Sequence, residues 1–155
     1  MKFTTLITST TLSLGILAGS AFAQDPISNA IGARQSLMRL YAFNIGTLGG
    51  MAKGAIAYDA AAATTAAANI AKLASIDGRA MFPTGSDDKA AANTAAKPEI
   101  WSNMADVGAK FGDLVKASIA MEAAAGGGLD ALKGGIGALG GACGACHKAY
   151  RTPKS

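Results

Sequence analysis

Histidine, cysteine and charge are all scarce in this sequence of 155 residues. The chain has one histidine, His147, and two cysteines, Cys143 and Cys146. A structural zinc site uses four Cys or His ligands, so the chain is one ligand short of such a site. Charged residues make up only 15% of the sequence, and the formal net charge is +4 with no block of one sign. This charge pattern gives no indication of nucleic-acid binding.

Strand signals are also missing. β-Branched residues never cluster, and only 4 prolines interrupt the chain. Start and stop signals instead predict four helices, at about residues 26–49, 58–76, 98–125 and 129–151. A loop of residues 77–97 separates the second helix from the third, and three consecutive glycines separate the third from the fourth. Residues 24–155 are therefore expected to form one all-α domain.

Three of the four predicted helices carry a seven-residue apolar repeat, which is typical of an antiparallel four-helix bundle. The second helix offers only Ile70 and Leu73, so its register is poorly set. The repeats consist of Ile27, Ile31, Arg34, Met38, Tyr41, Ile45 and Leu48 in the first helix; Ile100, Met104, Val107, Phe111, Leu114, Ser118 and Met121 in the third; and Leu129, Leu132, Ile136, Leu139, Cys143, Cys146 and Tyr150 in the fourth.

The three scarce residues together form a Cys-x-x-Cys-His motif, the attachment signature of haem c. The two thiols lie one helical turn apart, where they can bond the two vinyl groups of one porphyrin, and His147 can then bind the iron as an axial ligand. Because both cysteines belong to the helical repeat, the covalent haem is expected to point into the bundle. A thioredoxin-like dithiol is the alternative, but it requires a βαβ pattern that is absent here.

A second axial ligand must come from upstream of the motif, because no methionine follows His147. Met38 is the best-placed candidate, one turn beyond Arg34 on the first helix. If its sulfur binds the iron, the protein is a six-coordinate electron carrier. If Met38 is only a steric gate, the iron is five-coordinate and binds small gases such as NO or CO. No second histidine remains to act as a distal acid or base, so the protein is not expected to be an enzyme.

Two residue choices in the predicted helices are unusual. Arg34 occupies an apolar repeat position, where a haem propionate would compensate its charge; alternatively, the side chain snorkels to the end of the bundle. The last helix contains glycines that would each cost about 1 kcal/mol relative to alanine. They are interpreted as allowing close approach of the flat macrocycle or of a neighbouring backbone, and are Gly134, Gly135, Gly137, Gly140, Gly141 and Gly144.

The first 23 residues are typical of a secretory signal peptide. Lys2 precedes a short apolar stretch, and Ala21-Phe22-Ala23 forms an Ala-x-Ala cleavage site. The stretch is too short and too rich in Thr and Ser to span a bilayer. Removal of Lys2 lowers the formal net charge from +4 to +3. The mature chain is thus expected in a periplasm, serving an unidentified redox partner, with its scattered lysines on ordinary solvated faces rather than in a docking patch.

Several short motifs, in this order, resemble the class II c-type cytochromes, chiefly cytochrome c′. The resemblance covers the whole mature chain. Its residues are Arg34-Gln35 with Met38, Ala52-Lys53-Gly54 with Tyr58-Asp59-Ala60-Ala61, Phe82-Pro83-x-Gly85, Lys97-Pro98-Glu99-Ile100-Trp101, and the haem motif with Tyr150-Arg151.

The resemblance implies a left-handed bundle, often a homodimer through its first two helices, with a haem that binds NO or CO or transfers electrons. It also implies roles for single residues. Arg34 and Gln35 would contact the propionates, Met38 would occupy the distal face, and Arg151 would lie near the proximal side. Ala95 stands where relatives often have an acidic residue, so only backbone contact is expected there. The low-spin branch of the class uses a methionine at the position of Met38 as a ligand.

Overall fold

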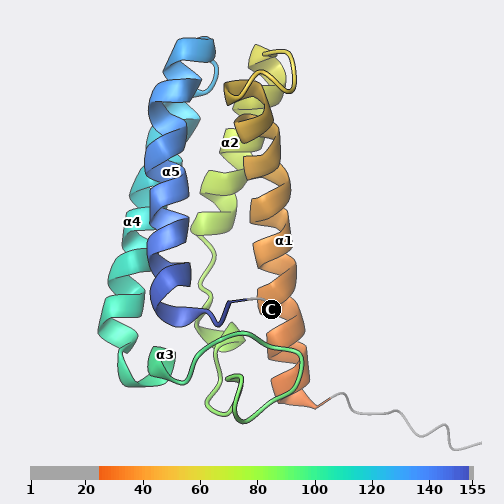
Figure 1. The fold of residues 1–155 in the computed structure, drawn as a ribbon, viewed down its shortest axis with the longest axis vertical. Helices are drawn as coiled ribbons and strands as arrows, with labels where there is room; N and C mark the ends of the chain where they lie inside the picture. Colours follow the sequence, from red (N-terminus) through yellow and green to blue (C-terminus); the bar gives the residue numbers. More distant parts are fainter. Residues whose placement is uncertain (1–24, 154–155) are drawn as a thin grey trace, which may run out of the picture.

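The computed structural model describes residues 25–153 and confirms the all-α, antiparallel four-helix bundle (Figure 1). In the described part of the chain there is no strand, only an isolated antiparallel bridge between Ala96 and Arg151. The predicted signal peptide, residues 1–23, lies outside the described residues. The elements are α1 (Pro26–Ala52), α2 (Ala60–Ala74), the 3-10 helix η1 (Arg79–Met81), α3 (Glu99–Ser102), α4 (Met104–Ala124) and α5 (Leu129–Tyr150).

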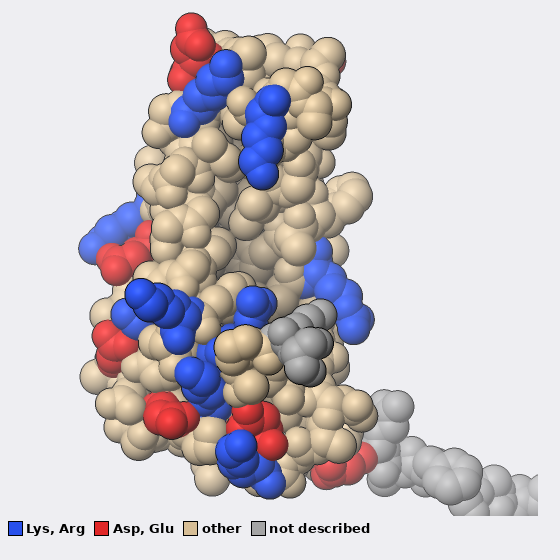
Figure 2. Space-filling view, viewed as in Figure 1, with Lys and Arg blue, Asp and Glu red and all other residues tan. Residues whose placement is uncertain are grey.

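The four long helices form a ring in which α1 packs on α2, α2 on α4, α4 on α5 and α5 on α1. Contact is sparsest between α1 and α5, the two helices in front in Figure 1. The space-filling view is hollowed between them (Figure 2). The segment with η1 and α3 crosses the end of the bundle where α1 begins and α5 ends. No helix within residues 25–153 is long and apolar enough to cross a membrane.

Side-chain caps fix where the first two long helices begin. The Asp25 carboxylate accepts hydrogen bonds from the backbone N–H groups of Ile27 and Ser28, both at 3.2 Å, and Pro26 occupies the first helical position. Asp59 accepts a bond from the Ala62 N–H at 2.7 Å. Such caps satisfy amides that have no partner inside the helix. The predicted start of the first helix is therefore confirmed.

The register of the second helix is set mainly by buried alanines. The search for a repeat of large apolar residues did not reveal this. Ala63, Ala66, Ala67 and Ile70 are all buried on one face of α2, at positions i, i+3, i+4 and i+7. Small side chains allow the neighbouring helices to pack closely against this face. The same core contains several fully buried larger residues from the other helices, namely Leu48, Met121, Leu132 and Leu139.

The predicted continuous third helix is wrong, because it breaks at Asn103. This residue has φ −130° and ψ 37°, which are not helical angles. Its amide Nδ2 donates to the Glu99 carbonyl at 2.9 Å, so the side chain competes with the helical backbone pattern. Met104 follows the break and is 46% exposed, so the expectation that it belongs to the core is also wrong. Burial resumes at Val107 and continues through Met121.

The expectation that the α5 glycines admit a neighbouring backbone is wrong as well. Only Gly135 has a close neighbour: a Cβ there would lie 2.7 Å from Met121 Cε, which is a side-chain atom. The remaining five have no protein atom within 4 Å of a Cβ position, and all five are exposed. Among these six glycines, only Gly135 is close enough to a neighbouring side chain that an added Cβ would force a shift, here of the end of Met121.

Candidate haem site

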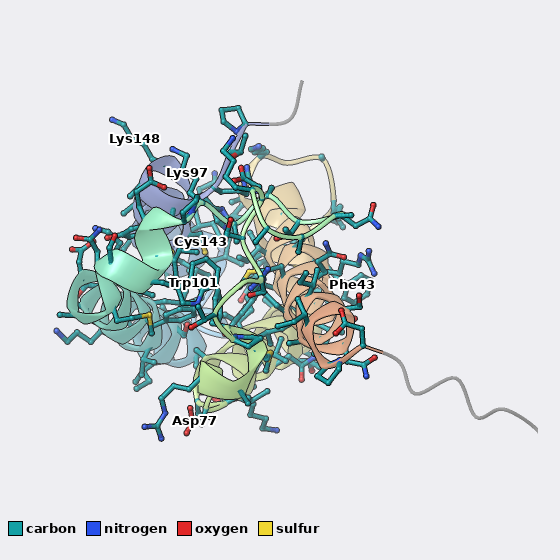
Figure 3. All side chains as sticks on the ribbon, turned by 90° about the horizontal axis from the view of Figure 1, so that it is seen from below. Phe43, Asp77, Lys97, Trp101, Cys143 and Lys148 are labelled. Atoms are coloured by element: carbon teal, nitrogen blue, oxygen red, sulfur yellow. The ribbon has the colours of Figure 1, made fainter. Side chains whose placement is uncertain are left out.

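The last turns of α5 place Cys143, Cys146 and His147 on one half-buried helix face. All three line a cavity of about 200 Å³. The stick view places Cys143 among the four helices (Figure 3). Met38 from α1 and Phe111 from α4 line the same cavity, whose walls are almost wholly apolar. The two thiols, the imidazole and the thioether therefore line one partly open, apolar space.

A second cavity of about 440 Å³ adjoins the first and shares Met38, Phe111, Cys146 and His147 with it. We call the two cavities together the groove. The second cavity adds the polar end of the site, with Arg34, Gln35, Ala95 and Arg151 in its wall. All eight site residues predicted from the sequence consequently line one cavity or both.

Arg34 is buried, with 6% of its surface exposed, so the alternative in which its side chain snorkels into water at the end of the bundle is wrong. Its Nη1 donates to the Met81 carbonyl at 3.2 Å and to Ser86 Oγ at 3.1 Å. Its Nη2 donates to the Ser86 carbonyl at 2.9 Å and to Thr94 Oγ1 at 2.8 Å. The guanidinium carbon also lies 4.9 Å from the centre of the Phe82 ring.

All of these partners of Arg34 are neutral. Within residues 25–153 no carboxylate forms an ion pair with it. Burial lowers the pKa of its guanidinium, because a desolvated cation is less favoured. A buried positive charge without a counter-charge is costly, and this one lines the second cavity. The polar end of the groove is thus suited to an anionic group.

The segment that contains Ala95 is hydrogen-bonded to the end of α5 and to the residues that follow it. The Thr152 N–H donates to the Ala95 carbonyl at 2.9 Å, and the Lys97 N–H donates to the Tyr150 carbonyl at 3.0 Å. Ala96 and Arg151 form the antiparallel bridge between these two bonds. On the other side of the loop, Gln35 Nε2 donates to the Asn93 carbonyl. These bonds hold the loop in the wall of the second cavity.

Burial sets the protonation of the motif. It raises the pKa of the Cys143 thiol, and it raises that of Cys146 despite the opposing effect of Lys110. Burial, together with the positive charge of Arg151, lowers the pKa of His147. A neutral imidazole is the form that binds metals. A reactive dithiol needs a depressed thiol pKa, which is the reverse of what is found here.

A zinc site, the alternative metal site weighed from the sequence, is not supported either. Residues 25–153 contain no group of three or more His, Cys, Asp or Glu side chains that could hold a metal ion. The groove fits haem c instead, by three features: two thiols one turn apart, an adjacent neutral imidazole, and an apolar space that ends at a buried, unpaired guanidinium.

The sequence did not assign Phe82, Lys110, Phe111 or Tyr150 to the site, although all four line the groove. The Phe82 and Phe111 rings meet edge to face at 6.1 Å, and Trp101 Nε1 donates to the Phe82 carbonyl at 3.1 Å. Phe111 and Tyr150 belong to the apolar repeats, which signalled burial but not a cavity. Lys110 carried no sequence signal, because only the fold turns it toward the motif.

The sequence profile of the family described as Cytochrome C' matches residues 29–151. The chain is 41% identical to a cytochrome c-554 of Cereibacter sphaeroides over 142 residues, which cover 90% of this chain and 93% of that one. It is 33% identical to a cytochrome c' of the same organism, covering 91% of this chain and 94% of that one. A cytochrome c-556 of Agrobacterium tumefaciens is 36% identical, with coverage of 79% and 94%.

Solved structures agree with these relatives. A cytochrome c' from Rhodobacter Spheriodes superposes with a TM-score of 0.81 at 34% identity, over 83% of this chain and 98% of that one. A cytochrome c' described as having an unusual ligand-controlled dimer dissociation gives a TM-score of 0.75 at 31% identity, over 83% and 98%. The family profile spans residues 29–151, a range that contains the motif and all residues that line the groove. The chain belongs to the cytochrome c′ family, whose cofactor is covalently bound haem c.

Proposed function

We propose that this protein is an exported electron carrier with one haem c, bonded to Cys143 and Cys146 and held at the iron by His147. The observation that carries the proposal is that both thiols, the imidazole and Met38 line one apolar cavity. Haem c, when bound, supplies a one-electron iron couple and, where an axial position is open, a binding place for diatomic gases.

Each remaining site residue has a role that follows from its place in the groove. Met38 lies on α1, across the cavity from the motif, so its sulfur is the candidate sixth ligand. The buried charge of Arg34 would meet a propionate through Nε, since its Nη atoms are occupied by the loop. Gln35 and Arg151 add hydrogen-bond donors at the same end. Ala95 offers only its backbone and methyl group.

A dedicated gas-binding protein is the second candidate. The apolar lining favours gas binding. Ile45, Leu114 and Ala142 line the cavity together with Met38, and their side chains contain no hydrogen-bonding group. Neutral molecules such as NO and CO enter such a space without a desolvation penalty. In this version Met38 is a steric gate and not a ligand.

Location and partner follow from the proposed chemistry. The signal-peptide pattern of residues 1–23 supports export to the periplasm, where a covalent bond prevents loss of the cofactor.

The ionisable side chains in the groove wall are cationic or tyrosine, apart from the motif itself. None is a distal carboxylate or a second histidine, so we propose a carrier and not an enzyme. Its redox partner would be another protein.

A homodimer through α1 and α2 is part of the proposal. Leu40 and Phe43 on the outer face of α1 are 50% and 74% exposed, and Phe43 points away from the bundle (Figure 3). Exposed apolar side chains of this size mark interaction surfaces when they lie together. Sedimentation should show a dimer for the wild type and a monomer for Phe43→Ser; a wild-type monomer at all concentrations would refute this part.

A visible spectrum tests the function directly. Protein made alongside haem-attachment machinery should show an intense Soret band, and its absence would refute the proposal. Low-spin bands with a sulfur-to-iron charge-transfer feature identify Met38 ligation and the carrier. A high-spin spectrum that shifts with CO identifies the gas binder. Met38→Ala should convert low-spin to high-spin, whereas the control Met104→Ala, which changes an exposed methionine outside the groove, should leave the spectrum unchanged.

A further inference from the structure

Asp106 on α4 links two side chains that line different parts of the groove. Tyr150 Oη donates to Asp106 Oδ2 at 2.6 Å, and Lys110 Nζ lies 3.5 Å from the same oxygen. Tyr150 belongs to the wall of the second cavity and Lys110 to that of the first. One carboxylate oxygen therefore holds a wall residue of each cavity, while Asp106 itself lines neither of them.

Tyr150 is connected to the haem motif because both lie on α5. Tyr150 is 8% exposed and lies one turn beyond Cys146, in the last turn of α5. Its carbonyl accepts the Lys97 N–H at 3.0 Å, so both ends of the residue are fixed. Since the neighbouring turn carries His147, fixing Tyr150 also limits how far the end of α5 can move relative to α4.

The lysine half of the link acts by charge. The other charged side chains in the groove wall are arginines, and no carboxylate lines either cavity. Asp106, whose Oδ2 lies 3.5 Å from Lys110 Nζ, thus places a negative charge next to a cationic residue of the groove wall. The Lys110 side chain is 23% exposed and the Asp106 side chain is 52% exposed, so water partly screens the interaction between the two charges.

We propose that Asp106 is a positioning residue that tunes the haem potential through Tyr150 and Lys110. The inference rests on the proposed haem site. Oxidised haem carries one positive charge more than reduced haem, so a nearby carboxylate favours the oxidised state and lowers the reduction potential. Without the carboxylate, Lys110 faces the motif unpaired, which favours the reduced state.

The test is the redox midpoint, measured by equilibration of the whole protein with indicator dyes. Asp106→Asn keeps the size of the side chain and an acceptor for Tyr150 but removes the charge. We expect the ratio of reduced to oxidised protein at a fixed poise to rise about three- to tenfold, which is about 30–60 mV for one electron. Asp106→Glu, which retains the charge, should stay within about twofold of the wild type.

Two further variants separate charge tuning from damage to the fold. Asp113→Asn removes the same charge from another pair on α4, in which Asp113 Oδ1 lies 3.7 Å from Lys116 Nζ, away from the groove. It should leave the midpoint unchanged. Lys110→Gln should move the midpoint in the opposite direction from Asp106→Asn, a sign reversal that loosened packing would not produce.

An unchanged midpoint in Asp106→Asn, or an equal shift in Asp113→Asn, would overturn the inference. Shifts of the same sign in Asp106→Asn and Lys110→Gln would overturn it as well. A normal haem spectrum with these results refutes the role of Asp106 and leaves the proposed function intact. A wild-type protein without a haem spectrum refutes both.

Discussion

The two ends of the bundle use the same helices in different ways. At the end where α1 meets α2, the repeats close into a solid core, and Leu48, Ile70 and Leu132 have no exposed surface. At the end where α5 finishes, Met38, Phe111 and Cys143 lie in the same repeats but remain partly exposed around the groove. We call these the closed end and the open end.

Side-chain size explains the difference. At the closed end, large residues of α1, α4 and α5 fill the space against the alanine face of α2. At the open end, Ala42 and Ala142 face the cavity between α1 and α5, where larger side chains would have filled it. A repeat thus identifies which face of a helix turns inward, but the volume of facing residues decides whether that face closes.

The largest effect is expected when the haem attachment at the open end is removed. Replacing both Cys143 and Cys146 with alanine removes the two attachment points, so covalent haem should be lost completely. Mass spectrometry of the denatured chain should show the polypeptide mass alone. As the control, Leu132→Ala alters only the closed end and should retain covalent haem; haem bonded to the double variant would contradict the assigned attachment.

Leu132→Ala is the matching break at the closed end. It removes a fully buried side chain, so it should cost about 2–5 kcal/mol of unfolding free energy, measured by urea denaturation. The loss should be similar with and without haem, because Leu132 does not line the groove. Phe111→Ala, by contrast, should cost clearly more in the haem-bearing protein. Equal costs for Phe111→Ala in both forms would erase the distinction between the two ends.

Two glycines of α5 test how tightly the closed end is packed. Alanine at position 135 would meet Met121 Cε at 2.7 Å, so Gly135→Ala should destabilise the protein by about 1–3 kcal/mol. Alanine at position 137 meets no protein atom within 4 Å, so Gly137→Ala should be stabilising by up to about 1 kcal/mol. Thermal melts of the two variants should therefore shift in opposite directions.

A tyrosine clamps the turn at the closed end. Tyr58 Oη donates to the Ala125 carbonyl at 2.9 Å and accepts from the Gly128 N–H at 3.0 Å, while Gly128 itself has φ +110°. Tyr58→Phe should cost about 1 kcal/mol in urea denaturation, because both backbone groups lose their partner. The absorption spectrum should not change, and a spectral shift would mean that the two ends are coupled.

The smallest expected effect is the alkaline titration of the open-end tyrosines. Burial raises the pKa of Tyr41 to about 12, and the hydrogen bond to Asp106 raises that of Tyr150 to about 12. Folding therefore favours the neutral phenols, a stabilisation that is complete below about pH 10 and is lost as pH rises toward 12. Ultraviolet titration should detect two late-ionising tyrosines, and Tyr150→Phe should remove one of them.

Much of the fold was predictable because the apolar repeats and the Asp25 cap are local signals. The eight predicted site residues all line the groove. The motif and the helical repeats indicated five of them, whereas Gln35, Ala95 and Arg151 came only from the family resemblance. The break at Asn103 was not predictable, because it depends on a side chain competing for one backbone carbonyl. The partners of Arg34 were not predictable either. They come from Met81, Ser86 and Thr94 in an irregular loop whose path only the folded chain defines.

The sparse seam between α1 and α5 has a consequence for the order of assembly. It joins residues far apart in the chain, such as Met38 and Cys143, whose separation is 105 positions (143 − 38). The pairs α1–α2 and α4–α5 join through short connections and lose less chain entropy on closing, so we expect them to form earlier. Until the two hairpins dock, we expect the sulfur atoms of α5 to face solvent, where an enzyme that attaches haem would reach them.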